Sequence, residues 1–365
     1  MLNNIINRIQ TLSKIKFRFD LPKSKKILQL DELNSDSLRK AIKIDFNVIP
    51  QRKREIYFWI FIRQIIFFDF KSSTYLKNFI KFSSTKIVIT LIDNNTSFYQ
   101  LKNLIENVCF ISIQNGLRIP STMNIKKLKK FKNLECDHFF VHNKYLIEKY
   151  KNKIKSKYHV LGSYKNNCFK VEKTKFKNSF LFVGFGAANW HSMRVGISHK
   201  LLSLIASYFL NSNIKLNILL KSKNIDDQNK EIKFYKNFFN SNCIFHKSYT
   251  PEKSYKILDK FENIIFTNST LGFEAIARKK KVAVFSVNQN KIEKKWFGWP
   301  KKYQKEYDFF SAKNLTYNEV KRVLENVYNC KQENWNRNYY KNIKDIMYFD
   351  KNNYQLKKVI NKILD

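Results

Sequence analysis

Polar residues that could bind a phosphorylated ligand stand between two apolar runs of the segment Ile264–Val287. The hydroxyls of Ser269 and Thr270 and the free N–H groups of the helix expected after them point at one spot. The helix dipole makes that spot attractive to an anion such as a diphosphate. Gly272 has no side chain to hold a ligand away from the backbone, and Glu274 could accept two hydrogen bonds from a ribose diol. The same pattern also fits a helix cap, with Glu274 complementing the dipole.

A carboxylate that could act as a base follows another apolar run, Lys86–Ile92. Asp93 comes directly after this run, at the carboxyl edge of the expected sheet, where ligands of open α/β sheets bind. A carboxylate in this position could take the proton of an attacking hydroxyl group. Alternatively, Asp93 caps the helix expected to start near Thr96, with Asn94 and Asn95 completing an Asx turn.

A second polar turn is expected beside the first, because it follows the next apolar run, Val108–Ile113. The side-chain amides of Gln114 and Asn115 can hydrogen-bond sugar hydroxyls, and Gly116 permits a positive φ. Arg118 can bind a phosphate or carboxylate through two parallel hydrogen bonds. An ion pair between Arg118 and a carboxylate of its own domain is the alternative.

Glycines and a lysine in the second half of the chain are further candidates for the ligand site. Gly184 and Gly186 belong to the stretch GFGAANWH, which is similar to G-x-G-x-x-G but has Asn189 in the last place. We interpret this stretch as a loop that faces phosphates. Lys221 ends an expected strand and could neutralise a phosphate there.

Histidine and cysteine patterns indicate neither a metal site nor a disulfide framework. His191 and His246 are the histidines nearest the expected site, and without a partner each is expected to be structural. No Asp-x-Asp pair follows a strand, so we expect no bound metal. The five cysteines are widely scattered without a C-x-x-C pair, so we expect reduced thiols and no zinc site.

The elements that position these residues follow from the apolar periodicity of the chain. Residues 1–24 are a basic lead-in with one candidate amphipathic helix over residues 2–15. Residues 25–165 alternate strands with helices, which predicts a doubly wound N-terminal domain with a parallel sheet. We expect strands at 26–30, 43–49, 86–92, 108–113, 137–142 and 158–161, and helices at 33–42, 56–70 (buried), 74–82, 98–106 and 144–150.

A second domain over residues 179–335 repeats this alternation. Residues 164–178 are polar and rich in lysine, and we interpret them as a linker. We expect strands at 179–184, 215–220, 243–246, 264–267 and 282–287, and helices at 198–210, 231–240, 252–261, 271–278, 317–328 and 335–347. The fold class is therefore α/β, with two Rossmann-like doubly wound parallel-sheet domains.

Several stretches carry a family resemblance. The S-T-x-G-x-E motif at residues 269–274 looks like the donor-nucleotide motif of two-domain GT-B glycosyltransferases. The stretches VITLIDNNTSFYQL, FISIQNGLR, GSYKNN and FGWPKKY resemble a family of bacterial surface-carbohydrate (polysaccharide) biosynthesis proteins that are regarded as glycosyltransferases. The resemblance extends over roughly residues 25–335. It implies a GT-B-like fold whose two domains face a cleft, and it implies that residues 336–365 hold helices of which the last crosses back to the first domain.

The net charge of +40, from 69 basic and 29 acidic residues, suggests an anionic partner. A phosphorylated donor, an acidic polysaccharide, an anionic lipid surface and a nucleic acid all fit. Part of the excess reflects codon usage, because Lys, Asn, Ile and Phe are abundant throughout while Gly and Pro are scarce. No apolar run reaches the roughly 18 residues of a spanning helix, and no secretory signal is present. We therefore expect a cytoplasmic protein, and peripheral contact with the inner face of the cytoplasmic membrane stays open.

Together these patterns predict a metal-independent glycosyltransferase of the hexosyl or nonulosonyl type. A sugar would pass from a nucleotide-sugar donor, the only co-substrate, to a surface polysaccharide or glycolipid acceptor. Donor-side residues are those around Glu274 together with Lys221, Gly184 and Gly186; acceptor-side residues surround Asp93, the candidate base. The sequence does not choose between inverting and retaining transfer.

Three rival functions fit the sequence. A polyol-phosphate transferase or a sugar-nucleotide epimerase would have the same two-domain plan, and a catalytically inactive scaffold is a further alternative. A basic nucleic-acid-binding protein is the rival from another class, because residues 291–307 combine lysines with aromatic side chains. Gly298 and Pro300 in that stretch indicate a shaped loop instead, so nucleic acid is the disfavoured partner.

Overall fold

The computed structural model describes residues 15–50, 55–116, 131–184, 195–239, 243–267, 269–285, 308–312 and 314–365. The chain divides into two compact units. The first comprises residues 1–115, 122–164 and 350–365, and the second comprises residues 116–121 and 165–349. The last helix of the chain therefore belongs to the first unit.

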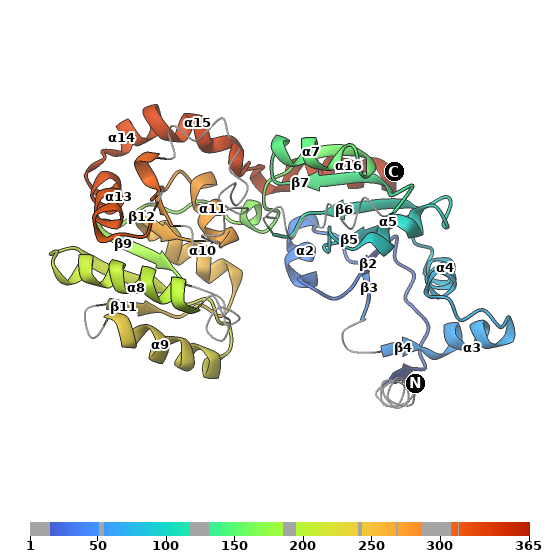
Figure 1. The fold of residues 1–365 in the computed structure, drawn as a ribbon. Coiled ribbons are helices and arrows are strands. Elements are labelled where there is room, and N and C mark those ends of the chain that lie inside the picture. Colours follow the sequence, from blue (N-terminus) through green and yellow to red (C-terminus); the bar gives the residue numbers. More distant parts are fainter. Residues whose placement is uncertain are drawn as a thin grey trace. The chain divides into compact units, whose positions relative to one another are not determined.

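A parallel sheet forms the centre of the first unit (Figure 1). Within the described residues its strand order is β3-β2-β5-β6-β7-β8. Every residue of β2 and β5 is buried, as expected for parallel strands covered on both faces. The chain adds β3 on one side of β2 and β5 on the other, so the strand order reverses between β2 and β5. The bounds are β2 Ile27–Leu30, β3 Asn47–Ile49, β5 Ile87–Thr90, β6 Cys109–Ile113, β7 Glu135–Val141 and β8 Lys155–Val160.

Helices from both ends of the chain surround this sheet. They are α2 Ser35–Ile42, α4 Ser72–Ser83, α5 Thr96–Lys102, α7 Lys144–Tyr150 and, after the short turn η7 Lys351–Asn353, the C-terminal α16 Tyr354–Leu364. A buried hydrogen bond fixes the start of α16, because the side-chain amide of Asn353 donates to the carbonyl oxygen of Tyr164 at 2.9 Å. The final segment is thus an integral part of the first unit.

The prediction of a helix over residues 56–70 is confirmed for residues 58–66, whereas the prediction that this helix is buried is wrong. Strand β4 Glu55–Tyr57 pairs in parallel with β1 Lys16–Arg18, and helix α3 Phe58–Ile66 follows it. Only Ile60 and Gln64 of α3 are buried, whereas large apolar side chains after them are exposed. The apolar composition of this segment resembles that of a core helix, but no described element covers most of its surface.

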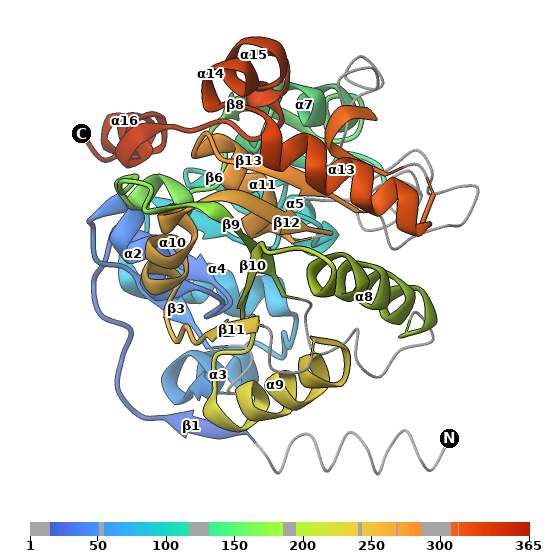
Figure 2. The same cartoon turned by 90° about the vertical axis from the view of Figure 1, so that its left-hand side faces the viewer.

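A second parallel sheet forms the centre of the second unit, with the strand order β11-β10-β9-β12-β13 in the described residues. The order reverses between β9 and β12. In Figure 2, α8 and α10 lie on opposite sides of β10. The α/β class with two doubly wound parallel sheets is therefore confirmed. The strands are β9 Phe176–Val183, β10 Lys215–Leu219, β11 Cys243–His246, β12 Phe261–Phe266 and β13 Lys281–Val284.

The helices of the second unit differ in two places from those predicted. Helix α9 begins at Ile225 instead of residue 231, because the side chain of Asn224 accepts the N–H of Asp227 at 2.7 Å and caps a polar first turn. The helix predicted over residues 335–347 is present, but it begins earlier, at Gln332, and contains a π-helical turn, Asn336–Tyr340. The bounds are η1 Asn166–Cys168, α8 Val195–Leu210, α9 Ile225–Phe239, α10 Pro251–Lys260, α11 Thr270–Ala277, α13 Tyr317–Asn329, α14 Gln332–Trp335, α15 Lys341–Ile343 and η6 Lys344–Ile346.

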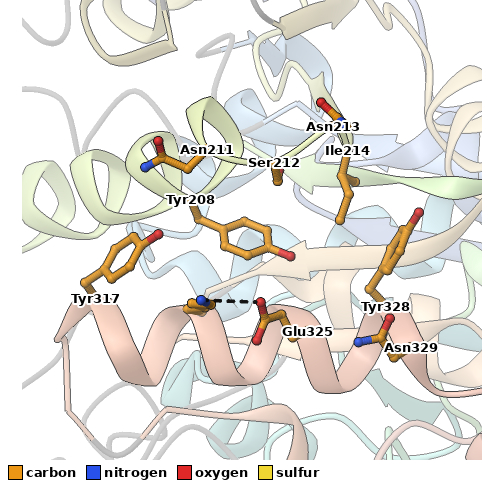
Figure 3. A pocket seen from close by; sticks show the side chains of 10 residues that line it. Tyr208, Asn211, Ser212, Asn213, Ile214, Tyr317, Glu325, Tyr328 and Asn329 are labelled. Atoms are coloured by element: carbon orange, nitrogen blue, oxygen red, sulfur yellow. Dashed lines mark ion pairs between the residues drawn. The ribbon is translucent and has the colours of Figure 1, made fainter.

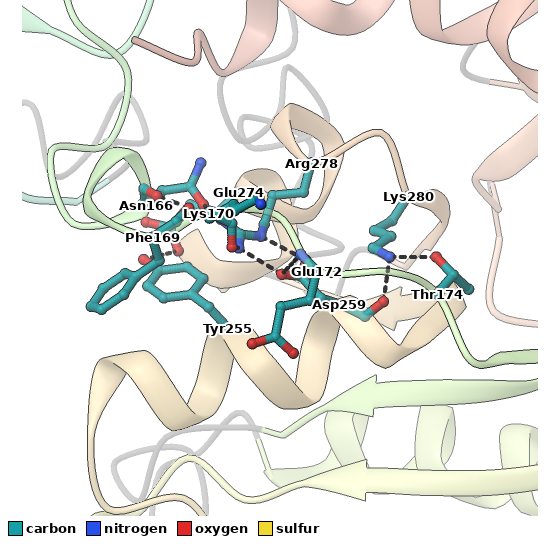
Figure 4. A network of polar contacts seen from close by, with 10 residues as sticks. All are labelled: Asn166, Phe169, Lys170, Glu172, Thr174, Tyr255, Asp259, Glu274, Arg278 and Lys280. Carbon is teal, nitrogen blue, oxygen red and sulfur yellow. Dashed lines mark hydrogen bonds and ion pairs between the residues drawn. The ribbon is translucent and has the colours of Figure 1, made fainter. Parts of the chain in front are cut away.

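A buried ion pair fixes the segment that follows Tyr164, which we interpreted as a linker (Figure 4). The Arg278 guanidinium contacts the Asp259 carboxylate at 2.7 Å, and both side chains are almost fully buried. The same guanidinium donates to the side chain of Asn166 at 2.8 Å and to the backbone oxygen of Lys170 at 3.0 Å. Residues 166–170 are therefore a fixed part of the second unit.

None of the helices in the described ranges is both long and apolar enough to cross a membrane.

Candidate functional site

The reversal of strand order in the second unit identifies its ligand-binding edge. Ligands of open α/β sheets bind beyond the carboxyl ends of the strands at such a reversal, and these strands are β9 and β12. Gly184 directly follows β9, while Ser269 and Thr270 follow β12. Lys221 follows β10, which is separated from β12 by β9. The described donor-side candidates thus form two groups: Ser269, Thr270, Gly272 and Glu274 belong to α11 and its N-cap, whereas Gly184 and the backbone of Lys221 both lie beside Glu231.

Ser269 occupies the N-cap position of α11, but its hydroxyl makes no capping hydrogen bond. The side chain is nonetheless buried. Its backbone oxygen accepts the N–H of Gly272 at 3.0 Å. Side-chain capping, the alternative to ligand binding, is therefore wrong for Ser269.

Glu274 lies in a polar cluster formed by three segments of the second unit. The side chain is 4% exposed, and its Oε2 accepts the hydroxyl proton of Tyr255, on α10, at 2.9 Å. Lys165 is also close: burial lowers the pKa of its amine, and the negative charge of Glu274 opposes that shift. Carboxylate oxygens are hydrogen-bond acceptors of the kind that the hydroxyls of a ribose need.

Tyr255 and Lys165 are members of this cluster that the sequence analysis missed. Lys165 stands in the GSYKNN stretch, which signalled it only through a family resemblance. Nothing in the sequence indicated that Tyr255 belongs to the site, since a tyrosine on an amphipathic helix is ordinarily a core residue. Its ring also packs against Phe169, with centroids 5.2 Å apart, and lies 5.0 Å from the Arg278 guanidinium carbon. The ion pair of Figure 4 therefore supports the cluster.

The two glycines of this edge face protein atoms, which corrects the reason we gave for Gly272. A Cβ on Gly272 would lie 2.1 Å from Cγ of Phe266 in β12. The missing side chain thus permits close packing of α11 on β12, and its role is not to admit a ligand. A Cβ on Gly184 would lie 2.8 Å from Oε1 of Glu231, so Gly184 also makes room for the protein itself.

Replacing Gly272 with Ala is expected to lower the free energy of unfolding by about 3 kcal/mol, because the new methyl group overpacks the ring of Phe266. Urea unfolding would measure this loss. Gly116→Ala is the matched control, since a Cβ there would meet Oγ1 of Thr270 at an ordinary 3.7 Å. Equal stability of the two variants would contradict the packing role.

The loop after β10 is held by a buried carboxylate. Oε1 of Glu231 accepts the backbone N–H of Lys221 at 2.9 Å, and Oε2 accepts that of Ser222 at 2.9 Å. Burial raises the pKa of Glu231. This contact explains the path of the loop, and a role of the Lys221 amine with a phosphate stays a prediction.

Asp93 lies at the corresponding edge of the first unit, where the strand order reverses between β2 and β5. It follows β5, and its side chain is 0% exposed. The hydroxyl of Tyr99 donates to its backbone oxygen at 2.6 Å. Asp31 follows β2 and is also buried, so a second carboxylate stands at this reversal that the sequence analysis did not single out.

Asn95, and not Asp93, is the N-cap residue of α5. Its Oδ1 accepts the N–H of Ser97 at 3.1 Å. The capping alternative that we weighed for Asp93 is therefore wrong. Asn94 lies between the two residues and is partly buried.

The two residues that directly follow β6, Gln114 and Asn115, both form hydrogen bonds with neighbouring segments of the first unit. Oε1 of Gln114 accepts the backbone N–H of His142 at 2.9 Å, so this side chain ties β6 to the end of β7. Oδ1 of Asn115 lies 3.2 Å from the amide nitrogen of Asn34 and 3.3 Å from the hydroxyl of Tyr164. Asn115 therefore connects the loops after β2 and β8 with its own, and the partly buried side chain borders the edge that carries Asp93.

Several predicted residues do not join these clusters. His246 is structural, since its Nε2 lies 2.8 Å from Oδ1 of Asn217 and burial lowers its pKa. Arg118, Gly186 and His191 lie outside the described residues. Among the residues that the structure describes, no group of three His, Cys, Asp or Glu side chains could hold a metal ion.

A separate cavity of about 320 Å³ lies between the end of α8 and helix α13 (Figure 3). Tyr208, Tyr317 and Tyr328 line it together with the Lys321–Glu325 ion pair of 3.8 Å. Residues 211–214, which precede β10, form another wall. The cavity is thus at the amino ends of the strands, the edge that open α/β sheets do not use for ligands.

Solved structures with the same fold include enzymes of different classes. A "putative UDP-N-acetylglucosamine 2-epimerase" from Listeria monocytogenes is similar at a TM-score of 0.57 and 12% identity, over 94% of this chain and 97% of that one. The wall teichoic acid polymerase TagF is similar at 0.50 and 14%, over 100% and 95%. The spinosyn forosaminyltransferase SpnP is similar at 0.50 and 10%, over 93% and 99%. These likenesses establish a GT-B-like fold and leave the reaction open.

The chain also matches a family model, although no curated protein matches it significantly. The model, described as "putative O-antigen biosynthesis protein", matches residues 111–200 and 197–364. These ranges cover well over half of the 365 residues. The chain, with its two doubly wound sheets and a polar cluster at the reversal of each, therefore belongs to this family of O-antigen biosynthesis proteins.

Proposed function

We propose that this protein is a glycosyltransferase of O-antigen assembly, which moves a sugar from a nucleotide-sugar donor to a saccharide or lipid-linked saccharide acceptor. The observation that carries the proposal is the buried carboxylate of Glu274, which lies in α11 beyond its first turn, in the segment that follows β12 at the reversal of strand order in the second unit. In this proposal the second unit binds the donor and the first unit supplies the catalytic base.

Donor binding would use the two ends of one short segment. The carboxylate of Glu274 would accept hydrogen bonds from the ribose diol, with Tyr255 holding it in place. Ser269 and Thr270, at the N-terminus of α11, would donate to the diphosphate, and the helix dipole would stabilise its charge. The hydroxyl of the N-cap residue Ser269, which makes no capping hydrogen bond to α11, supports this assignment.

Chemistry would require a base for the acceptor hydroxyl and stabilisation of the leaving group. The carboxylate of Asp93 would take the hydroxyl proton while the oxygen forms a new bond to the anomeric carbon. The bond between that carbon and the nucleoside diphosphate breaks, and the leaving oxygen keeps the electron pair. Dipoles at the start of α11 would stabilise this charge without a metal ion.

The second candidate is a sugar-nucleotide epimerase or polyol-phosphate transferase, because a putative UDP-N-acetylglucosamine 2-epimerase and a wall teichoic acid polymerase have a similar fold. All three reactions need a nucleotide-diphosphate site in the second unit. They differ in the acceptor side. Release of nucleotide with sugar attached to an acceptor supports transfer, whereas conversion of the free nucleotide-sugar to its epimer supports the alternative.

Replacing Glu274 with Ala is expected to weaken nucleotide-sugar binding by about 10–100-fold, because a charged acceptor of one or two hydrogen bonds is lost. A thermal-shift screen over UDP-, GDP-, dTDP- and CMP-sugars would first identify the donor, since a ligand of the folded state raises the melting temperature. Calorimetric titration of that donor would then measure the loss.

Glu252→Ala is the matched control, since Glu252 pairs with Lys256 on the exposed side of α10. This variant should bind the donor normally. If Glu274→Ala bound the nucleotide-sugar as tightly as the control variant does, Glu274 would not be part of the donor site. Equal stabilisation by every polyanion, inorganic polyphosphate included, would reduce the effect to the charge of the chain and overturn the donor proposal.

A further inference from the structure

Helix α3 and the turn after it expose six large apolar side chains on the first unit. We call this set the α3 surface: Trp59, Ile65, Ile66, Phe67, Phe68 and Phe70. Phe67 and Phe68 are 67% and 86% exposed. In Figure 1 the helix lies beside β4 and α4 at the side of the unit, away from the central sheet strand β6. Large exposed apolar surfaces mark sites of interaction with a partner or a membrane.

The side chains of a buried glutamine and a partly exposed aspartate hold the turn in this exposed position. The side-chain amide of Gln64, which is 4% exposed, donates to the backbone oxygens of Asp69 and Lys71, both at 2.9 Å. The carboxylate of Asp69 in turn accepts the hydroxyl of Thr74 at 2.6 Å and the N–H of Lys71 at 3.2 Å. The aromatic side chains are thus presented by a fixed polar frame.

Phe68 adopts a backbone conformation that is unfavourable for its residue type. Its φ is 47°, in the left-handed region that Gly, Asn and Asp prefer and that is exceptional for a bulky residue. A strained, outward-pointing Phe costs stability and contributes little packing to the fold. The conformation is that of the C′ residue of a Schellman motif, since the N–H of Asp69 donates to the backbone oxygen of Gln64 and that of Phe68 to the backbone oxygen of Ile65, both at 3.0 Å. The end of α3 therefore fixes Phe68 in an exposed position.

The excess of basic residues around the α3 surface favours an anionic partner. Residues 58–82 contain four basic residues and one acidic residue, Asp69, whose carboxylate is engaged within the turn. The Arg63 guanidinium lies 5.8 Å from the rings of Phe67 and Phe82, and Lys71 is exposed. Aromatic side chains surrounded by Lys and Arg are typical of segments that lie in the headgroup region of an anionic bilayer.

A second copy of the chain fits this surface less well. A symmetric dimer would place the same patch on itself and bring like charges together. The interior of protein interfaces is also depleted of Lys. With its nine residues, α3 suits binding in the plane of the interface.

We propose that the α3 surface docks this protein on an anionic lipid bilayer, with Phe67, Phe68 and Phe70 inserted among the acyl chains and the nearby Lys and Arg side chains on the headgroups. This docking is independent of the reaction that the protein catalyses. It would hold the first unit where lipid-linked acceptors are found.

Flotation of the full chain with vesicles tests the proposal. Vesicles of phosphatidylcholine mixed with phosphatidylglycerol should bind the protein, and phosphatidylcholine alone should bind it more weakly. The triple variant Phe67→Gln/Phe68→Asn/Phe70→Gln should lower the partition coefficient by about 100-fold. Asn suits the left-handed position, so this variant should fold at least as well as the wild type.

Leu104→Gln/Leu210→Gln is the matched control, since these side chains are 51% and 53% exposed outside the α3 surface, and its vesicle binding should be unchanged. If the triple variant bound vesicles as well as the wild type does, the proposal would be overturned, because a segment other than the α3 surface would then bind the membrane. A second outcome would also overturn the proposal: the wild type does not bind vesicles but sediments as a dimer, and the triple variant sediments as a monomer. The α3 surface would then bind a second copy of the chain.

Discussion

Asp93→Asn is expected to reduce kcat/KM for sugar transfer by about 10²–10⁴-fold, the usual contribution of a general base. The amide keeps the size of the carboxylate but cannot accept the proton of an acceptor hydroxyl. Donor affinity should be unchanged, because the donor residues belong to the second unit. Steady-state kinetics with the donor identified in the nucleotide screen, together with calorimetric titration of that donor, would measure both effects.

Asn95→Ala controls for the structural contribution of the same turn. Asn95 caps α5 through the N–H of Ser97, so its loss should cost about 1 kcal/mol of stability with little effect on kcat/KM. If Asp93→Asn kept full activity, Asp93 would not be the base. If it instead lost stability as well as activity, the buried carboxylate would be a structural group of the turn.

Arg278→Ala is expected to lower the free energy of unfolding by about 3–5 kcal/mol, because it leaves the Asp259 carboxylate buried and unpaired. The loss also releases the backbone of Lys170 and the side chain of Asn166. The melting temperature should therefore fall, and trypsin should cleave at Lys170 faster. Nucleotide affinity should fall too, because Lys165 of the Glu274 cluster precedes the released segment.

Two further variants make this prediction specific. Arg337→Ala is the control, since the Arg337 side chain is exposed and bonds only to Asn334 in the hydrogen bonds found for it, and its loss should change stability little. Arg278→Met/Asp259→Leu removes both charges and should recover part of the stability. A melting temperature of Arg278→Ala equal to that of Arg337→Ala would contradict the structural role of the pair.

Most strands could be predicted because parallel strands covered on both faces are written as continuous apolar runs. The runs that contain β5, β6 and β12 are cases in point, and each is buried along its apolar length. From these runs the order of elements, and thus the α/β class, also followed. Polar residues directly after them could then be assigned to the carboxyl edges of the sheets.

Helix α3 shows where composition misleads. The sequence FWIFIRQII has the apolar content of a buried helix, and nothing local distinguishes a face packed in the core from one left uncovered. Only the packing of the first unit, in which Gln64 is buried and Phe68 is exposed, decides the matter. For the same reason, the apolar composition of this segment could not predict that its side chains form the exposed α3 surface.

By itself, the sequence determined that Asp93, Ser269 and Glu274 follow the ends of buried strands, because alternation and helix signals are local properties. Tertiary structure alone decided their surroundings. Tyr255 reaches Glu274 from α10, Asn34 reaches Asn115 across 81 positions of the chain, and the missing side chain of Gly272 admits Phe266. Such contacts depend on strand order and on the direction in which helices pack, and no local pattern of residues encodes either of these.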